Sequence, residues 1–431
     1  MNGRTLLLGL LLILAGPGRA IPETAAAEDA SLAPSLERLE AMLLERSPAL
    51  AVREALTHAS HESVGPESAL PDPMFEFMLQ DVGFPDMTIG GEEMSMALFE
   101  LRQNILFPGK RKARRNAAMA ETRVSGLERD RLERKLLAEL RGLYARLYAL
   151  DRESEVLGAA RELLDVLKET VSMRYSAGEA DQEAVLKVQL EHFRILERVE
   201  DLEAKRKGLV AGLNGLLDLP GDSPFGEVVE LPPTALPSND LEDLAASRAP
   251  EVVVKTAELD TAEKQLEAAR MESRPNLSLG GGGAYRGELD PVAVFRLGVE
   301  IPFWRKSKVK AMISARDYEV RAAHQGLRQS KAGARAGLVR WLARWESASR
   351  QVQLYEEAIL PQSSAAFDAA RASYITGQGQ FSTVIEDFGL WLEARAGLAK
   401  RQAEEFIAWA EVRYLTGDHG QGHEGRAGEM Q

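Results

Sequence analysis

The longest uninterrupted feature of the sequence is a heptad-patterned run from Gly109 to Val171. No proline lies between Pro108 and Pro220, and an aliphatic residue recurs every seventh position at Leu136, Leu143, Leu150, Leu157, Leu164 and Val171. This spacing predicts a helix that packs nearly parallel to other helices. At 1.5 Å per residue the helix would be roughly 95 Å long, far longer than the helices of compact enzymes. The chain is therefore expected to build a strut or the wall of a pipe.

The first twenty residues are typical of a secretory signal peptide. Arg4 supplies the charged start, Leu6 to Ala15 form the apolar core, and Gly18 and Ala20 are the small residues that precede cleavage. The apolar core is too short to remain as a membrane helix. The sequence thus predicts an exported protein with a signal peptide at 1–20 and an N-terminal linker at 21–34.

The composition excludes several classes of function. The formal net charge is −13, which argues against nucleic acid as a partner. The chain has no cysteine, which suits an exported protein without disulfides and leaves no cysteine for lipid attachment, so we expect a protein that is not lipidated. No other run approaches 18 apolar residues, and no transmembrane helix is expected.

The chain contains two copies of one unit. Four short motifs recur in the same order at an offset of about 200 residues, the last being Tyr175 with Gly178 and Tyr374 with Gly377. The copies span 35–218 and 240–416. The intervening segment, 219–239, holds five prolines and is predicted to be a linker or irregular equatorial segment, and residues 417–431 form a Gly-rich tail expected to be disordered.

Each copy has the same predicted internal order. A helix leads to a strand hairpin (74–107, then 276–303), a long helix (109–174, then 305–374) and a return helix (180–217, then 380–415). Hydrophobic alternation marks the strands, whose lengths are near those that cross a bilayer at a tilt. The fold class is therefore mostly α with a small β part.

Four membrane strands cannot close a barrel, and open strand edges are not tolerated in lipid. Closure needs several copies, and three copies give twelve strands, enough for an aqueous lumen. Two hydrophobic seams on each long helix indicate neighbours on both sides, as in a ring of helices.

These features resemble the TolC family of outer-membrane factors, over essentially the whole mature chain. The most specific motif is Tyr-x-x-Gly followed seven and eight residues later by two aliphatic residues, and it occurs in both copies. The resemblance implies a homotrimer with a 12-stranded β-barrel on a 12-helix α-barrel in the outer membrane. It implies a periplasmic adaptor and an inner-membrane pump of the resistance-nodulation-division or ABC type as partners. The start of the first strand, Pro71-Asp72-Pro73, and the exit from the second, Phe107-Pro108-Gly109-Lys110, also resemble the heavy-metal cation efflux branch.

The two motifs supply the candidate site for adaptor docking, at a periplasmic tip. Its residues are Tyr175, Gly178, Val185, Leu186, Tyr374, Gly377, Val384 and Ile385. Carboxylates that follow the glycines are candidates for an acidic aperture ring, which would attract cations: Glu179, Asp181, Glu183, Glu386 and Asp387. The alternatives are that the motifs only stabilise a hairpin and that the carboxylates only solvate a helix face.

Cations gather at the start of both long helices, where they oppose the helix dipole. They include Lys110, Arg111, Lys112, Arg305, Lys306 and Lys308. Lipid phosphates beneath the membrane strands could offset this charge. Pairing with carboxylates of a neighbouring subunit is the alternative.

No cofactor or metal centre is predicted. Five methionines lie in one hairpin (Met74, Met78, Met87, Met94 and Met96), but such residues more often pack or face lipid than bind Cu(I). His58 with His61, and His419 with His423 in the tail, are better explained as exposed residues than as metal ligands. No nucleophile–base constellation is present, so an enzyme is not expected.

The sequence therefore predicts a passive export duct of a tripartite efflux system, for metal cations or small toxic compounds. The alternatives are the outer-membrane component of a type I protein secretion system and a periplasmic coiled-coil scaffold without a pore.

Overall fold

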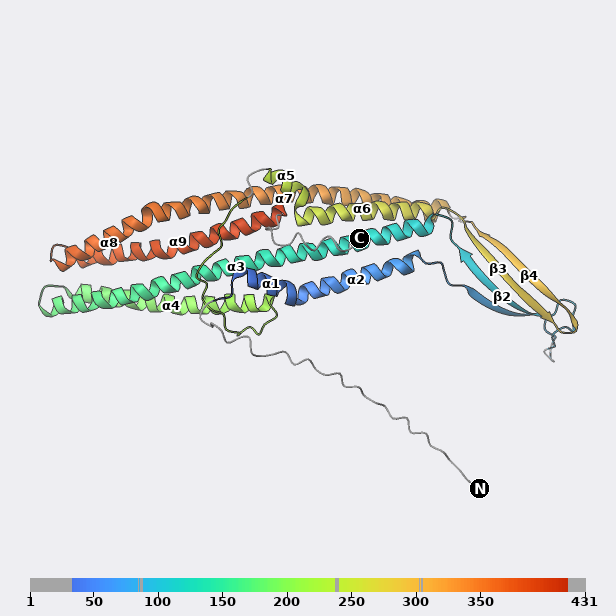
Figure 1. The fold of residues 1–431 in the computed structure, drawn as a ribbon, viewed down its shortest axis with the longest axis horizontal. Coiled ribbons are helices and arrows are strands. Elements are labelled where there is room, and N and C mark those ends of the chain that lie inside the picture. The colour runs from blue at the N-terminus through green and yellow to red at the C-terminus, as the bar shows by residue number, and fades with distance from the viewer. Residues whose placement is uncertain are drawn as a thin grey trace, which may run out of the picture.

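The computed structural model describes residues 33–83, 85, 88–236, 240–301, 303 and 305–417, and only the backbone of residues 305 and 306. The predicted signal peptide, Met87, and the tail with His419 and His423 lie outside the described residues. The molecule is elongated, with the strands at one end and two helical turns at the other (Figure 1).

The two halves of the chain repeat one order of elements. The first half contains α1 (Leu36–Arg46), α2 (Pro48–Ser68), β1 (Met74–Gln80), β2 (Met96–Ile105), α3 (Lys110–Ser176) and α4 (Gln182–Leu216). The second half contains α5 (Leu241–Arg248), α6 (Pro250–Met271), β3 (Asn276–Arg286), β4 (Leu289–Glu300), α7 (Lys310–Leu354), α8 (Leu360–Ile375) and α9 (Phe381–Thr416). None of the described helices combines the length and apolarity that crossing a bilayer requires.

Helix α3 is the single long helix that the heptad spacing predicts. Leu157, Leu164 and Val171 are almost completely buried, and Leu140 and Leu147 of the second seam are fully buried. These seams have different partners, because α3 packs against α2, α6, α4 and α9 along its length. The expectation of neighbours on both sides is confirmed.

The second long helix is not uniform. Five π-helical residues, η2 (Tyr355–Ile359), separate α7 from α8, and another π-helical segment, η1 (Arg305–Val309), precedes α7. Pro361 lacks the N–H that an α-helix would donate to the carbonyl four residues earlier, and a π-helical turn just before it accommodates the missing bond. The predicted helix at 305–374 is therefore helical throughout but changes its hydrogen-bond register.

The four strands form one antiparallel sheet in the order β1-β2-β3-β4. The turn-rich segment 81–95 connects β1 and β2, whereas β3 and β4 are joined by a short turn with Gly287 at φ +63°. β4 begins at Leu289 and ends at Glu300, three residues before the predicted end of the hairpin at 303. The last ladder pair of β4 joins Glu300 to Asn276, the first residue of β3, so the strand ends where its partner begins.

The segment between the two halves is an irregular strap held by polar contacts. Buried Asp151 of α3 accepts hydrogen bonds from Arg206 Nε at 2.7 Å and from the Val228 N–H at 2.9 Å. Arg206 also donates to the carbonyl of Gly226 at 2.8 Å, and Trp409 of α9 donates to the carbonyl of Ala235 at 2.8 Å. The strap therefore joins the helical hairpin of the first half, α3 with α4, to α9 of the second half.

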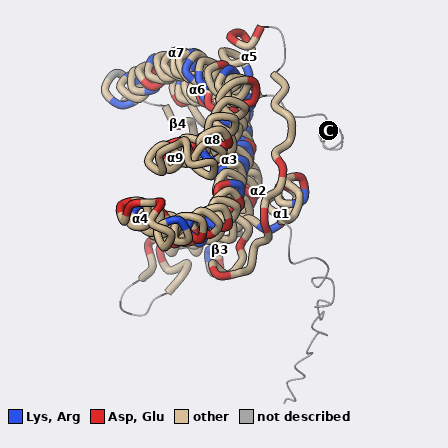
Figure 2. Tube along the Cα trace, turned by 90° about the vertical axis from the view of Figure 1, so that its left-hand side faces the viewer, with Lys and Arg blue, Asp and Glu red and all other residues tan. Residues whose placement is uncertain are grey.

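Two apolar clusters hold the helices together. One lies at the level of the strap and unites α1, α3, α4 and α9, and the other lies towards the helical turns and unites α3, α4, α8 and α9. Viewed along the long axis, the helices form a curved layer with α7 near one end and α4 near the other (Figure 2).

Candidate functional site

The two helical turns have the same backbone geometry. Gly178 has φ +76° and Gly377 has φ +78°. In each turn the residue directly after the glycine donates its N–H to a carbonyl of the last helical turn. Glu179 donates to the Arg174 carbonyl at 2.8 Å, and Gln378 donates to the Ser373 carbonyl at 2.9 Å. This left-handed ending favours glycine because a side chain would be strained there. The turns lie side by side at the end farthest from the sheet (Figure 1).

The tyrosines of the two motifs have different environments. Tyr175 is 47% exposed, whereas Tyr374 is 5% exposed, lies 5.2 Å from the ring of Phe381, and its hydroxyl has no hydrogen-bond partner among the described residues. Burial raises the pKa of the Tyr374 phenol, while the nearby Arg174 charge acts in the opposite direction. Of the two tyrosines, only Tyr175 is available to a docking partner in the single chain.

Arg174 connects the two turns. Its guanidinium lies 4.7 Å from the centre of the Tyr374 ring and donates a hydrogen bond to the Tyr374 carbonyl. Its Nε also lies 3.7 Å from Glu179. One side chain of the first half thus holds the turn of the second half, and the end of the molecule is a single unit of two linked turns.

The aliphatic residues after the two glycines also differ between the copies. Val384 is fully buried, and Val185 and Ile385 are partly buried against the apolar cluster near the turns. Leu186 is 57% exposed. Three of these four residues therefore stabilise the hairpins, and Leu186 faces outwards.

The candidate aperture carboxylates lie at the same end of the molecule. Glu179, Asp181, Glu183 and Glu386 are exposed, and Asp387 is partly buried. Glu183 lies 2.6 Å from Lys187, and this hydrogen bond and charge hold the pKa of Glu183 below its usual value. Asp181, Glu386 and Asp387 form no ion pair within the described part of the chain, so they remain available to attract cations.

One face of the sheet is apolar and uncovered. The register places Phe77 beside Phe99, with ring centres 4.9 Å apart, and places Leu101 between Phe75 and Gly281. Phe295 of β4 is 87% exposed and Leu297 is 70% exposed. Exposed apolar residues continue across all four strands: Phe75, Phe77, Leu79, Phe99, Leu101, Leu277, Leu279, Phe295, Leu297 and Val299. A sheet with such a face is suited to lipid.

The opposite face carries a network of charges. Glu100 is 1% exposed and lies 3.3 Å from Arg102 and 3.1 Å from Arg296, while Arg102 also lies 3.0 Å from Glu76. A side chain at Gly280 would collide with the Glu100 carboxylate. The space that this buried carboxylate needs therefore explains Gly280, whereas a side chain at Gly282 would collide with the Phe99 carbonyl of the neighbouring strand.

The basic residues beneath the sheet fall into two groups. Lys110 is 2% exposed, and its Nζ lies 2.8 Å from Asn276 Oδ1 and 3.3 Å from Glu272. Burial of Glu272 opposes its ionisation, but Arg114 and Lys110 outweigh this effect and hold the pKa of Glu272 below its usual value. The lipid role predicted for Lys110 is wrong, because the second half of the same chain provides its partners.

The other basic residues remain at the surface. Arg111 is exposed and donates from Nε to the Ser68 carbonyl at 2.8 Å, and Lys112 and Lys308 are exposed. The side chains of Arg305 and Lys306 lie outside the described part of the structure. Lys112 and Lys308 therefore keep their candidate membrane-proximal role.

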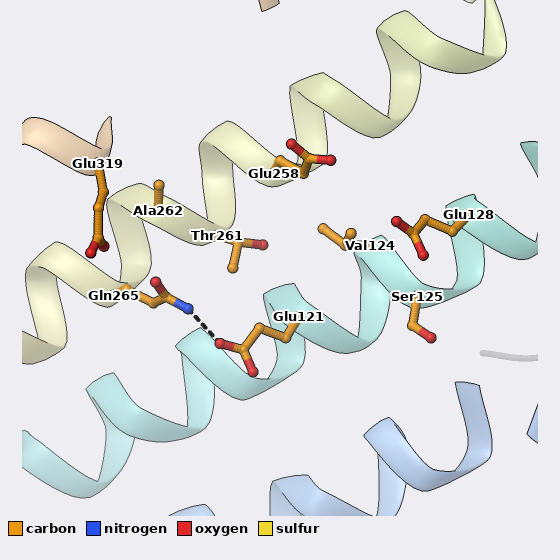
Figure 3. Close-up of a pocket in the computed structure, with 9 residues that line it drawn as sticks. All are labelled: Glu121, Val124, Ser125, Glu128, Glu258, Thr261, Ala262, Gln265 and Glu319. Carbon is orange, nitrogen blue, oxygen red and sulfur yellow. Dashed lines mark hydrogen bonds between the residues drawn. The ribbon is translucent and has the colours of Figure 1, made fainter. Parts of the chain in front are cut away.

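A groove in the wall lies between α3, α6 and α7 and has a volume of about 340 Å³ (Figure 3). Four carboxylates line it, but Glu128, Glu258 and Glu319 lie 2.6 to 2.7 Å from Arg53, Lys255 and Arg316 respectively. Glu121 accepts a hydrogen bond from Gln265. Among the described residues no group of three His or carboxylate side chains is placed to hold a metal ion.

Comparisons with known proteins identify the fold. Residues 241–418 match the sequence model of the family described as outer membrane efflux protein. The chain has the fold of the outer-membrane channel OprN, with a TM-score of 0.77, 16% identity, and coverage of 94% of this chain and 99% of that one. It is also similar to the outer membrane protein VceC of Vibrio cholerae, with a TM-score of 0.74, 15% identity, and coverage of 89% and 96%.

A third similar structure is the MtrE outer membrane channel of Neisseria gonorrhoeae in its open state, with a TM-score of 0.73, 17% identity, and coverage of 90% of this chain and 89% of that one. No curated protein matches the chain. The resemblance to a TolC-like outer-membrane factor and the mostly helical fold class are confirmed.

Proposed function

We propose that three copies of this chain form the outer-membrane channel of a tripartite efflux system. The observation that carries the proposal is the pairing of two features at opposite ends of one molecule. One end is a four-stranded sheet with an apolar outer face and two open edges, β1 and β4. The other end is a pair of linked helical turns far from the sheet.

The open strand edges explain why one chain cannot form a closed barrel by itself. Among the described strands β1 and β4 each pair on one side only, so their outer backbone groups would lack partners in lipid. Three sheets joined edge to edge give twelve strands and no free edge. The curved layer of helices beneath each sheet would close into a hollow cylinder by the same symmetry (Figure 2).

The helical turns are the proposed docking surface for a periplasmic adaptor. Tyr175, Leu186 and Glu179 are exposed there, and the glycine turns give each hairpin a blunt end. Engagement of this end would separate the two turns by replacing the contact of Arg174 with Tyr374. The channel performs no chemistry, and the energy of transport is used by the inner-membrane pump.

The proposed cargo is metal cations or small toxic compounds. Exposed carboxylates near the turns, Glu179 and Glu386 among them, favour cations at the entrance. At the other end, Lys112 and Lys308 would contact phosphates of the inner leaflet. The location is the outer membrane, with a long periplasmic extension.

The first experiment is to purify the mature protein in detergent, measure its mass, and insert it into planar bilayers. We expect a trimer that conducts ions. A monomer that stays in solution without an amphiphile would exclude the channel and favour a periplasmic scaffold.

The second experiment is deletion of the gene followed by growth on a panel of metals, dyes and antibiotics. Sensitivity that the wild-type gene restores supports efflux and names the cargo class. Loss of a secreted protein with unchanged resistance would instead indicate a type I secretion system.

A further inference from the structure

One stretch of α7 carries only positive charge in an acidic protein. The whole chain has a formal net charge of −13, yet residues 320–345 contain no carboxylate and six basic residues: Arg321, Arg328, Lys331, Arg335, Arg340 and Arg344. Lys and Arg recur along α7 in Figure 2. A surface that only keeps a protein soluble mixes charges of both signs. The excess of one sign therefore indicates a surface that attracts anions.

Part of this stretch forms a groove. The groove has a volume of about 580 Å³, and its lining contains His324, Arg328, Lys331 and Arg335 but no carboxylate. Arg335 lies 3.6 Å from Glu242 of α5. Arg328 and Lys331 are exposed and form no ion pair or hydrogen bond with any described residue. Two cations in the groove are therefore free to bind an anion.

The groove lies on the side of the helical layer that carries α5. Arg335 contacts Glu242 on that side, and Arg328, seven residues earlier, lies on the same face of α7. Helix α5 and the strap lie on the convex side of the curved layer (Figure 2). In the proposed cylinder the convex side faces outwards. The groove is therefore not placed to meet cargo in the lumen.

The groove is also too far from the membrane to bind lipid phosphates. Helix α7 begins at Lys310 and runs away from the sheet (Figure 1). Arg328 lies 18 residues after Lys310, which is roughly 27 Å along the helix. In the proposed orientation this level is within the periplasm.

A long duct in the periplasm has to pass through peptidoglycan, a polymer whose peptide stems carry free carboxylates. Guanidinium and ammonium groups bind carboxylates through charge-assisted hydrogen bonds. Arg328 and Arg335 are roughly 10 Å apart along the helix, so the groove presents a row of cations rather than a single point. A row suits a polymer, because several weak contacts to one strand act together.

We propose that this groove binds the carboxylates of peptidoglycan and anchors the channel in the cell wall. Arg328 and Lys331 make the main contacts, because Arg335 is shared with Glu242. Each of three copies would present one groove, and the three contacts together would hold the assembly. This inference rests on the proposed function for the outward direction of the groove and for its place in the periplasm.

The test is cosedimentation of the detergent-solubilised protein with purified peptidoglycan sacculi. Arg328→Gln/Lys331→Gln should lower the bound fraction at least roughly fivefold. The matched control, Arg340→Gln/Arg344→Gln, removes the same charge from the opposite face of α7, where both arginines lie on Trp341 at 5.7 and 4.7 Å from the ring centre. The control should bind as the wild type does.

A charge-conserving variant shows whether the groove variant fails for want of charge. Arg328→Lys/Lys331→Arg should keep most of the binding. Equal binding by the groove variant and the control variant would overturn the inference, as would absence of binding by the wild type.

The chemistry of the ligand is tested with sacculi whose carboxylates have been converted to amides. These sacculi should no longer retain the wild-type protein, and added salt should weaken its binding to native sacculi. Undiminished binding to the amidated sacculi would overturn the inference. Vesicles of anionic phospholipid provide a comparison, and a loss of binding by the groove variant on vesicles alone would assign the groove to lipid instead.

Conductance separates this inference from the channel proposal. Arg328→Gln/Lys331→Gln should conduct ions in planar bilayers as the wild type does, because the groove lies outside the lumen. A wild-type protein that binds sacculi but does not conduct would contradict the channel proposal and leave the groove assigned to peptidoglycan.

Discussion

The two hairpins that end in the glycine turns descend from the same repeat but are built differently. In the first, α3 is unbroken, and its contact with α4 is made by aliphatic residues such as Leu164 and Ile195. In the second, π-helical residues precede α8, and the contact with α9 is mostly aromatic: Phe367, Tyr374, Phe381, Phe388 and Trp391. Identical turns therefore do not require identical helices. The first hairpin is a regular strut, and the second depends on a few large side chains.

The largest expected difference concerns these aromatic residues. Phe388→Ala removes a fully buried ring that lies 5.8 Å from both Phe367 and Trp391, and it should lower the free energy of unfolding by about 3–5 kcal/mol. Hydrogen exchange of the detergent-solubilised protein should show the loss of protection in α8 and α9. The matched variant Ile195→Ala should act on α3 and α4 instead. Equal loss of protection in all four helices would show that the hairpins do not differ.

The next effect concerns the contact beside the π-helical turn. A Cβ at Gly397 would lie 2.6 Å from Cε1 of Tyr355, so Gly397→Ala should destabilise the protein by about 1–3 kcal/mol. Gly389→Ala in the same helix has open space around it and should stabilise by about 1 kcal/mol through helix propensity. Thermal unfolding of both variants measures the difference, and the same sign for both would contradict the close packing of Tyr355.

A smaller effect is expected at the link between the hairpins. Arg174→Gln loses the contacts with Tyr374 and should cost about 1 kcal/mol. Spin labels on Ser176→Cys and Thr376→Cys should then report a broader distance distribution. Arg371→Gln is the control, because Arg371 lies on Phe367 within the second hairpin, 5.9 Å from the ring centre. An unchanged distribution in Arg174→Gln would mean that Arg174 does not hold the turns together.

The smallest effect is a pH dependence restricted to the first hairpin. Lys187 lowers the pKa of Glu183, so its stabilising contribution is complete above the usual value of 4.5 and is lost as pH falls through the lower folded value. Ser382 occupies the corresponding place in α9 and does not titrate. Hydrogen exchange at pH 7 and pH 3, corrected for intrinsic rates, should show weakening at the start of α4 that Glu183→Gln abolishes. Equal weakening of α9 would exclude this origin.

Periodicity alone predicted much of this architecture. The heptad at Leu157, Leu164 and Val171 identified α3, and alternation identified the strands, because both patterns depend on residues close in sequence. The turns at Gly178 and Gly377 were predicted from the Tyr-x-x-Gly motif, which is also a pattern of neighbouring residues. Each of these features is determined within a short stretch of chain.

The contacts between distant segments could not be predicted in this way. Lys110 is buried because Glu272 and Asn276, from the other half of the chain, surround it. Arg174 reaches Tyr374 only because the two turns lie side by side. Pro361 is a signal of irregularity that could have been used, but it would not have shown that the helix continues through it with a changed hydrogen-bond register. A carboxylate in an apolar strand opposite a glycine run, as at Glu100, is a signal that could have been used.

The two unpaired borders of the sheet also affect how the protein reaches its destination. A single copy exposes rows of free backbone N–H and C=O groups next to bulky apolar side chains, which is the surface that leads chains to aggregate. In the proposed assembly, membrane insertion and oligomerisation would therefore be coupled, because only neighbouring copies satisfy these strand edges.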